Sequence, residues 1–168
     1  ASEDANWLFM PNADGSVTIL NTLREQDING FTQWISADSG FITNATVVDD
    51  QLYMIDKRTI NGNIEYHIER WSFDHMMDDS IIFNPGPTDT QLTGLGYLEG
   101  KTVQILADGV VLTERTVVGG QVVLTSEELG YTSIEVGLNF PVEVKGMPLN
   151  TNIGSGENQM RIKRIVRM

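Results

Sequence analysis

The sequence predicts an all-β fold, and three observations carry that prediction. Segments rich in Val, Ile, Thr, Tyr and Phe alternate polar and apolar side chains along most of the 168 residues. Short connections contain Asp-Gly or Asn-Gly pairs, which tolerate the positive φ angles of tight hairpin turns. No long stretch shows the periodicity of an amphipathic helix. We therefore expect an antiparallel meander that resembles a propeller blade, followed by a small β-sandwich or barrel domain.

The first unit, residues 1–88, is predicted to be the propeller-like meander. NWLFMPN and SVTILN flank Ala13-Asp14-Gly15, which suits a hairpin turn. FTQWIS, FITNATVV, QLYMIDK and IEYHIERW follow, with turns at ADSG, Asp49-Asp50 and Asn61-Gly62. These four strands predict one self-contained antiparallel sheet over residues 31–72, and residues 6–21 predict part of a neighbouring blade.

The second unit, residues 89–168, is predicted to be a small all-β domain. Residues 74–91 break the alternation, and Pro85-Gly86-Pro87 cannot continue a central strand because proline lacks the ladder donor. Strands resume as KTVQILAD, VVLTERTV, GQVVLT, SIEVGLNF, PVEVKG and MRIKRIVRM, while SEELGY is at most one helical turn. The apolar residues expected to form this unit's core are Val103, Ile105, Val123, Ile134, Val136 and Leu138.

Charge is unevenly distributed along the chain. The net charge is −12, yet Arg161, Lys163, Arg164 and Arg167 all fall in the last eight residues, so residues 1–160 carry about −16. Phosphate backbones repel such an acidic body, so nucleic-acid binding through it is disfavoured. The four basic residues are a candidate interaction surface for an acidic partner, and a solvated strand face is the alternative. Without cysteine, disulfides and zinc–thiolate sites are excluded.

The stretch GLGYLEGKT, residues 94–102, superficially resembles a loop that cradles phosphates. A P-loop needs its first glycine at position 95, which is Leu, and the third glycine of a dinucleotide motif would fall on Glu99. Both motifs also need a helix after the loop, whereas Lys101 precedes a predicted strand. We expect a turn here, with no nucleotide and no cofactor.

Other candidate sites have structural interpretations. His67 shares a face of its strand with Glu65 and Glu69, which predicts a polar face with a hydrogen-bonded histidine. Asp74, His75, Asp78 and Asp79 could hold a cation, but their spacing fixes no ligand geometry, and we assign no metal. Trp7, Trp34 and Trp71 are predicted as sheet-core anchors, with a sugar platform as the alternative. No nucleophile context such as Gly-x-Ser-x-Gly appears, so no catalytic residues are assigned and no enzyme is expected.

Residues 92–125 resemble a recurrent segment of bacteriophage tail and virion structural proteins; their sequence is LTGLGYLEGKTVQILADGVVLTERTVVGGQVVLT. In that segment a Gly-[HL]-[LY]-Leu-Glu-Gly-[KR]-x-Val stretch leads into Val-x-Val/Ile-Leu-Ala-Asp-Gly. IEVGLNFPVEVKGMPLN and MRIKRIVRM resemble its continuation, with Phe140 where the family commonly has Tyr. LREQDINGFTQWISADSGFI and LYMIDKRTINGNIEYHIER resemble the family's propeller-like part, with Trp34 at its tryptophan.

The resemblance covers roughly residues 20–168 and implies a tail nozzle or tail tubular protein. Such a protein assembles as a ring with copies of itself and other tail proteins, has no catalytic residues and resides in the virion after synthesis in the host cytoplasm. The family is longer than 168 residues, which implies that this sequence is a fragment. The alternative is a glycan- or receptor-binding β module, either a phage receptor binder or an adhesin.

Overall fold

The computed structural model describes residues 6–23, 28–86, 88–144, 152–153 and 156–157. These residues form antiparallel sheets with no α-helix, and only two short 3₁₀ turns, η2 (Gly96–Leu98) and η3 (Ser126–Glu128), interrupt the strands. No helix among them is long and apolar enough to cross a membrane. The all-β prediction is therefore confirmed. None of the described sheets closes into a barrel.

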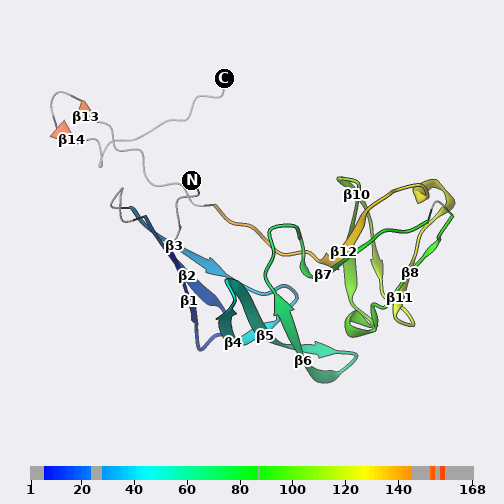
Figure 1. The fold of residues 1–168 in the computed structure, drawn as a ribbon, viewed down its shortest axis with the longest axis horizontal. Coiled ribbons are helices and arrows are strands. Elements are labelled where there is room, and N and C mark those ends of the chain that lie inside the picture. Colours follow the sequence, from blue (N-terminus) through cyan, green and yellow to red (C-terminus); the bar gives the residue numbers. More distant parts are fainter. Residues whose placement is uncertain (1–5, 24–27, 87, 145–151, 154–155, 158–168) are drawn as a thin grey trace.

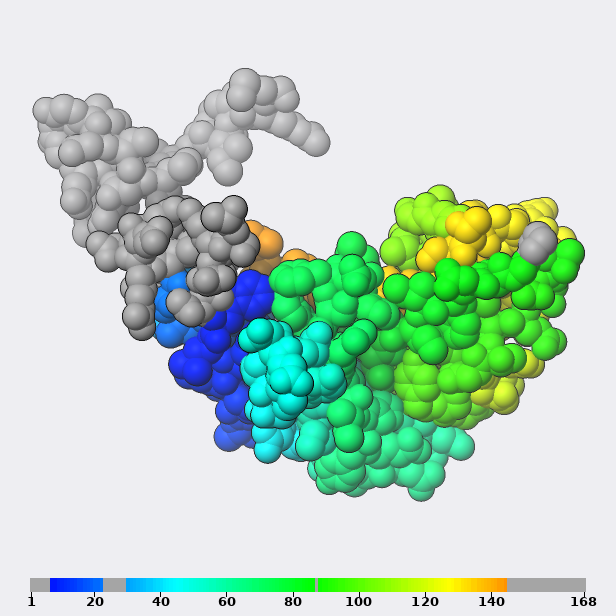
Figure 2. Space-filling model, in the orientation of Figure 1, coloured from blue at the N-terminus to red at the C-terminus, as the bar shows by residue number. Residues whose placement is uncertain are grey.

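The first half contains two three-stranded meanders. One has the order β1 (Asn6–Pro11), β2 (Val17–Leu23), β3 (Ile28–Trp34), and the other β4 (Phe41–Val48), β5 (Gln51–Ile60), β6 (Asn63–Arg70). The second meander lies between the N-terminal strands and the sheets formed by residues 78–138 (Figures 1 and 2). Positive φ angles at Asp49, Asp50, Asn61 and Gly62 confirm the predicted hairpin turns.

The prediction of one four-stranded sheet over residues 31–72 is wrong. FTQWIS contributes to β3, and β3 pairs with β2 along its whole length, from Leu23↔Ile28 to Val17↔Trp34. The chain then turns through Asp38 and Ser39, both at positive φ, and starts a new sheet at Phe41. Sequence alternation identifies strands, but it does not decide which neighbour a strand pairs with.

The second half is a two-layer arrangement around one core. Its larger sheet has the order β10 (Val110–Thr116), β9 (Thr102–Ala107), β12 (Ile134–Leu138), β7 (Asp78–Phe83). Its smaller sheet pairs β8 (Gln91–Thr93) with β11 (Gln121–Val123). Farther along, β13 (Asn152–Ile153) pairs with β14 (Gly156–Glu157).

Strand β7 has no clear signal in the sequence pattern. Its first residues, Asp78-Asp79, have the composition of a turn, and the interruption of alternation over residues 74–91 hid the strand behind them. The strand pairs with β12 and ends before Pro85. The boundary placed near residue 88 stays a prediction, but β7 lies on the N-terminal side of that position and completes a sheet whose other strands follow it.

The predicted second core is confirmed at five of its six positions. Val103, Ile105, Ile134, Val136 and Leu138 are buried in one cluster with residues of the smaller sheet. The prediction for Val123 is wrong, since it is 51% exposed while Val122 is 1% exposed. A one-residue shift in the assumed alternation reverses the two faces of a strand. The strand predicted at PVEVKG is absent from residues 141–144, and MRIKRIVRM lies outside the described residues.

Candidate functional site

The predicted interaction residues Arg161, Lys163, Arg164 and Arg167 lie outside the described part of the chain. The described part instead contains two features with functional potential, on opposite faces of the β4–β5–β6 sheet. One is an exposed apolar face, and the other is a buried cluster of charged side chains.

The outer face of the β4–β5–β6 sheet exposes large apolar side chains. Ile64, Tyr66 and Ile68 of β6 are 61%, 62% and 79% exposed. They lie directly opposite Thr59, Lys57 and Ile55 of β5, which places all six on one surface. The alternation of β6 was predicted correctly, but the sequence alone gave no sign that its apolar face is the one turned to solvent.

Two basic residues belong to the same face. Lys57 lies opposite Tyr66, and Arg70 follows Ile68 on the same side of β6. Among the described residues, the other basic side chains are Arg58, Lys101 and Arg115, and each of these forms an ion pair. We call the set Ile55, Lys57, Ile64, Tyr66, Ile68 and Arg70 the outer face. It combines exposed apolar area with cations that have no ion pair within the described chain.

The inner face of the sheet carries a buried ionic cluster centred on Arg58. Its guanidinium Nη2 lies 2.7 Å from Asp56 Oδ2, 2.8 Å from Asp78 Oδ2 and 3.3 Å from Glu69 Oε1. Arg58 Nε lies 3.3 Å from Asp79 Oδ2, and Nη1 donates to the Ala37 carbonyl at 2.7 Å. Because Asp78 and Asp79 begin β7, the cluster joins the meander to the larger sheet of the second half.

Further hydrogen bonds tie the loop after β3 into this cluster. Ser36 Oγ donates to Asp56 Oδ2, and the Ala37 amide donates to Asp78 Oδ2 at 2.6 Å. Gly40 lies so close that a side chain there would collide with Ser36, Asp56 and Arg58. The cluster therefore fixes where the chain leaves one sheet and enters the next.

Burial and charge excess perturb the pKa values in the cluster. Burial lowers the pKa of Arg58, but the carboxylates of Asp78, Glu69 and Asp56 outweigh it and raise that pKa above its ordinary value. Burial, reinforced by Asp78 and Asp79, raises the pKa of Glu69 to about 8. Burial likewise raises the pKa of Asp79, against the opposing effects of Arg58 and His67. Four carboxylates thus surround one guanidinium, and Glu69 holds its proton at neutral pH.

The four residues considered for a cation do not converge. Asp78 contacts Arg58 and Asp79 contacts His67, whereas His75 Nδ1 lies 2.7 Å from Ser80 Oγ, and Asp74 is exposed. The structure instead brings ligand atoms of His67, Glu69 and Asp79 within 4.8 Å of one another. Arg58 already contacts both carboxylates, so we interpret the group as part of the ion-pair network. His67 is hydrogen-bonded through Nδ1 to Asp79, as predicted for a histidine on a polar face.

The stretch GLGYLEGKT forms a structural junction. Leu95 and Leu98 are buried, and the Glu99 carboxylate accepts hydrogen bonds from the Gly119 and Gly120 amides at 2.9 and 2.7 Å. Lys101 Nζ lies 2.5 Å from Asp38 Oδ2 in the loop after β3. The predicted strand after Lys101 is confirmed as β9. Within the stretch, the amides of Leu98, Glu99, Gly100 and Lys101 donate to backbone carbonyls of the chain.

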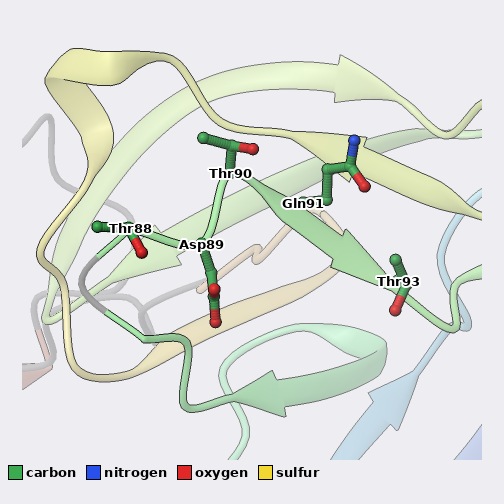
Figure 3. Close-up of a pocket in the computed structure, with 5 residues that line it drawn as sticks. All are labelled: Thr88, Asp89, Thr90, Gln91 and Thr93. Atoms are coloured by element: carbon green, nitrogen blue, oxygen red, sulfur yellow. The ribbon is translucent and has the colours of Figure 1, made fainter.

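Two shallow hollows occur in the described structure. One, of about 310 Å³, is lined by Thr88, Asp89, Thr90, Gln91 and Thr93, all from one short segment (Figure 3). The side chains of Asp89 and Thr90 point in opposite directions, so they do not converge on a ligand. The other, of about 510 Å³, lies beside the Lys101–Asp38 ion pair and includes Gln104 and Glu114.

The tryptophans divide between core and surface. Trp34 and Trp71 are half-buried and pack against the core of the first half, as predicted. Trp7 is 37% exposed and forms an edge-to-face cluster with Trp71 and Phe73, with ring centroids 5.2 and 5.9 Å away. The cluster extends to the surface because Phe73 is exposed, but its rings are inclined to one another.

Comparison of the sequence with protein-family models and with curated proteins found no match.

Proposed function

We propose that the chain is a structural component of a bacteriophage virion tail, of the nozzle or hub type. In this role it acts without catalysis, through assembly contacts with copies of itself and with other tail proteins. The observation that carries the proposal is the outer face, where Ile64, Tyr66 and Ile68 are exposed side by side on a regular sheet. Contiguous exposed apolar surface of this kind is typical of protein–protein contact sites.

Three further features support the proposal. The segment over residues 92–125 resembles phage tail structural proteins, as described above. The glycine-rich part of that segment serves as a junction between loops and sheets. The buried ionic cluster joins the two halves through the ion pair between Asp78 and Arg58. A component of an assembly needs such a connection to keep its shape.

Mass spectrometry of purified virions tests the proposal. The virions to analyse are those of the phage whose genome encodes this protein. The loss of host proteins during purification is the control for the purity of the particles. We expect peptides of this protein in the particles, with a fixed number of copies per particle that corresponds to one ring. Their absence from complete, infectious particles would refute the proposal.

A second candidate function is glycan or receptor binding, and the aromatic cluster favours it. Phe73 is 74% exposed beside Trp7, and exposed aromatic rings stack on sugars. Glycan-array screening of the wild type and of Phe73→Ala tests it. A specific signal that Phe73→Ala abolishes supports this candidate, and an array with no signal rejects it.

A further inference from the structure

The outer face is a continuous surface with a definite chemical character. Ile55 lies directly opposite Ile68, Lys57 opposite Tyr66, and Tyr53 opposite Arg70. Side chains at directly opposed positions of an antiparallel pair touch or nearly touch, so the apolar and basic groups form one patch. The patch has an apolar centre at Ile68 with a cation on each flank.

This basic character contrasts with the rest of the protein. The chain carries 23 acidic and 11 basic residues. In the described part, Arg58, Lys101 and Arg115 are engaged with this chain's own carboxylates, which leaves Lys57 and Arg70 as the cations outside ion pairs. Both of them lie on the outer face, so the face complements an acidic surface.

We propose that the outer face binds an acidic, partly apolar surface on a second copy of this chain, in a heterologous contact. The inference deepens the proposed structural function and rests on it. A copy of this chain is a suitable partner because its own surface is strongly acidic, with a net charge of −12. Its exposed acidic residues include Asp49, Asp50, Glu114 and Glu127.

Charge decides between the two possible symmetries of the contact. In an isologous contact the same face meets itself, and Lys57 and Arg70 would oppose the same cations of the partner, which is unfavourable. A heterologous contact pairs the outer face with a different surface and repeats from copy to copy. Such a contact closes into a ring when its rotation permits.

Strand β10 offers a matching surface on the second copy. It lies at the edge of the larger sheet, where it pairs only with β9. Val110 and Val111 are exposed there, and Glu114 on the same strand is exposed and forms no ion pair within the described chain. A strand that exposes both valine side chains and a carboxylate unpaired within the described chain offers groups complementary to Ile68, Lys57 and Arg70.

Sedimentation velocity with the 168-residue chain at about 0.15 M salt tests the inference, since surface charges still interact over about 8 Å there. One variant carries Ile68→Asp together with Lys57→Glu. The matched control is Val123→Asp, a substitution at an exposed valine on a different sheet. Thermal unfolding of both variants checks that each folds as the wild type does.

We expect the wild type and Val123→Asp to associate, and the outer-face variant alone to associate about tenfold more weakly or not at all. A labelled outer-face variant should still bind unlabelled wild type, because its acidic surface is intact in a heterologous contact.

Association of the variant equal to that of the wild type would overturn the inference. Failure of the variant to bind the wild type would also overturn it, since that result indicates an isologous contact. A wild type that remains monomeric would overturn it as well. Presence of the protein in virions with any of these results would leave the proposed function intact and remove only this surface.

Discussion

Arg58 concentrates the electrostatic interactions of the fold on one side chain. Its side chain is 2% exposed and contacts Asp56, Asp78, Asp79 and Glu69. Each carboxylate belongs to a strand, so the guanidinium holds together β5, β6 and β7. Neutralising four acids with one cation leaves an excess of negative charge, which the raised pKa of Glu69 relieves by proton uptake.

Arg58→Met is expected to lower the free energy of unfolding by about 3 to 5 kcal/mol, because it leaves buried carboxylates without their cation. Lys57→Met is the matched control, one residue earlier on β5 but on the outer face. Its expected effect is within about 0.5 kcal/mol, as for other surface substitutions. Urea unfolding measures both variants. Equal losses for the two would show that the cluster does not stabilise the fold.

Glu69 is expected to make stability depend on pH. Its folded pKa of about 8 exceeds the ordinary value of 4.5, so the folded state keeps a proton that the unfolded state releases. Its contribution is therefore full below about pH 4.5 and declines as pH rises towards about 8. Glu69→Gln removes this titration, so the variant should lose less stability than the wild type between pH 5 and pH 8. The expectation would be contradicted if urea unfolding gave both proteins the same change in the free energy of unfolding with pH.

At the scale of elements, alternation within a strand was the most reliable guide to structure. It located the hairpin turns at Asp49-Asp50 and Asn61-Gly62, all four residues at positive φ, and most of the second core. It failed where distant residues decide which strands pair or which face of a strand is buried. β3 joined β2, β7 formed from a segment with the composition of a turn, and the inner face of β5 accepted Asp56 and Arg58 because β7 supplies partners.

The register of β11 gives a direct test at this scale. Val122→Asp places a charge in the core and should lower the free energy of unfolding on the order of 3 kcal/mol or more, since no partner is available there. Val123→Asp, on the opposite face, should change it little. Urea unfolding of the pair measures the difference. A larger loss for Val123→Asp would reverse the assignment of the two faces.

For the whole molecule, sequence reasoning reached the fold class but not the candidate site. His67, Glu65 and Glu69 were correctly assigned to one face of β6, yet only the structure showed that the opposite, apolar face is exposed. The signal for the ionic cluster was Asp56 and Arg58 in an otherwise apolar alternation from Leu52 to Ile60. The Arg58 partner Asp78 lies 20 residues further along the chain, and single-strand patterns do not contain such distant contacts.

Net charge sets the expected salt dependence of assembly. Copies that each carry −12 repel one another at low salt, and the repulsion is screened beyond about 8 Å at 0.15 M ionic strength. Association should therefore strengthen as salt rises from a few millimolar towards physiological values, and sedimentation velocity measures it. A sedimentation coefficient independent of ionic strength over this range would count against assembly of the acidic body.

Electron microscopy of the protein expressed in full, at physiological salt, tests the central claim most directly. A structural tail component of the nozzle type should form rings with a uniform number of copies, and substitution of Ile68 and Lys57 on the outer face should disperse them. A field of monomers for the wild type, at concentrations well above those in an infected cell, would contradict the claim.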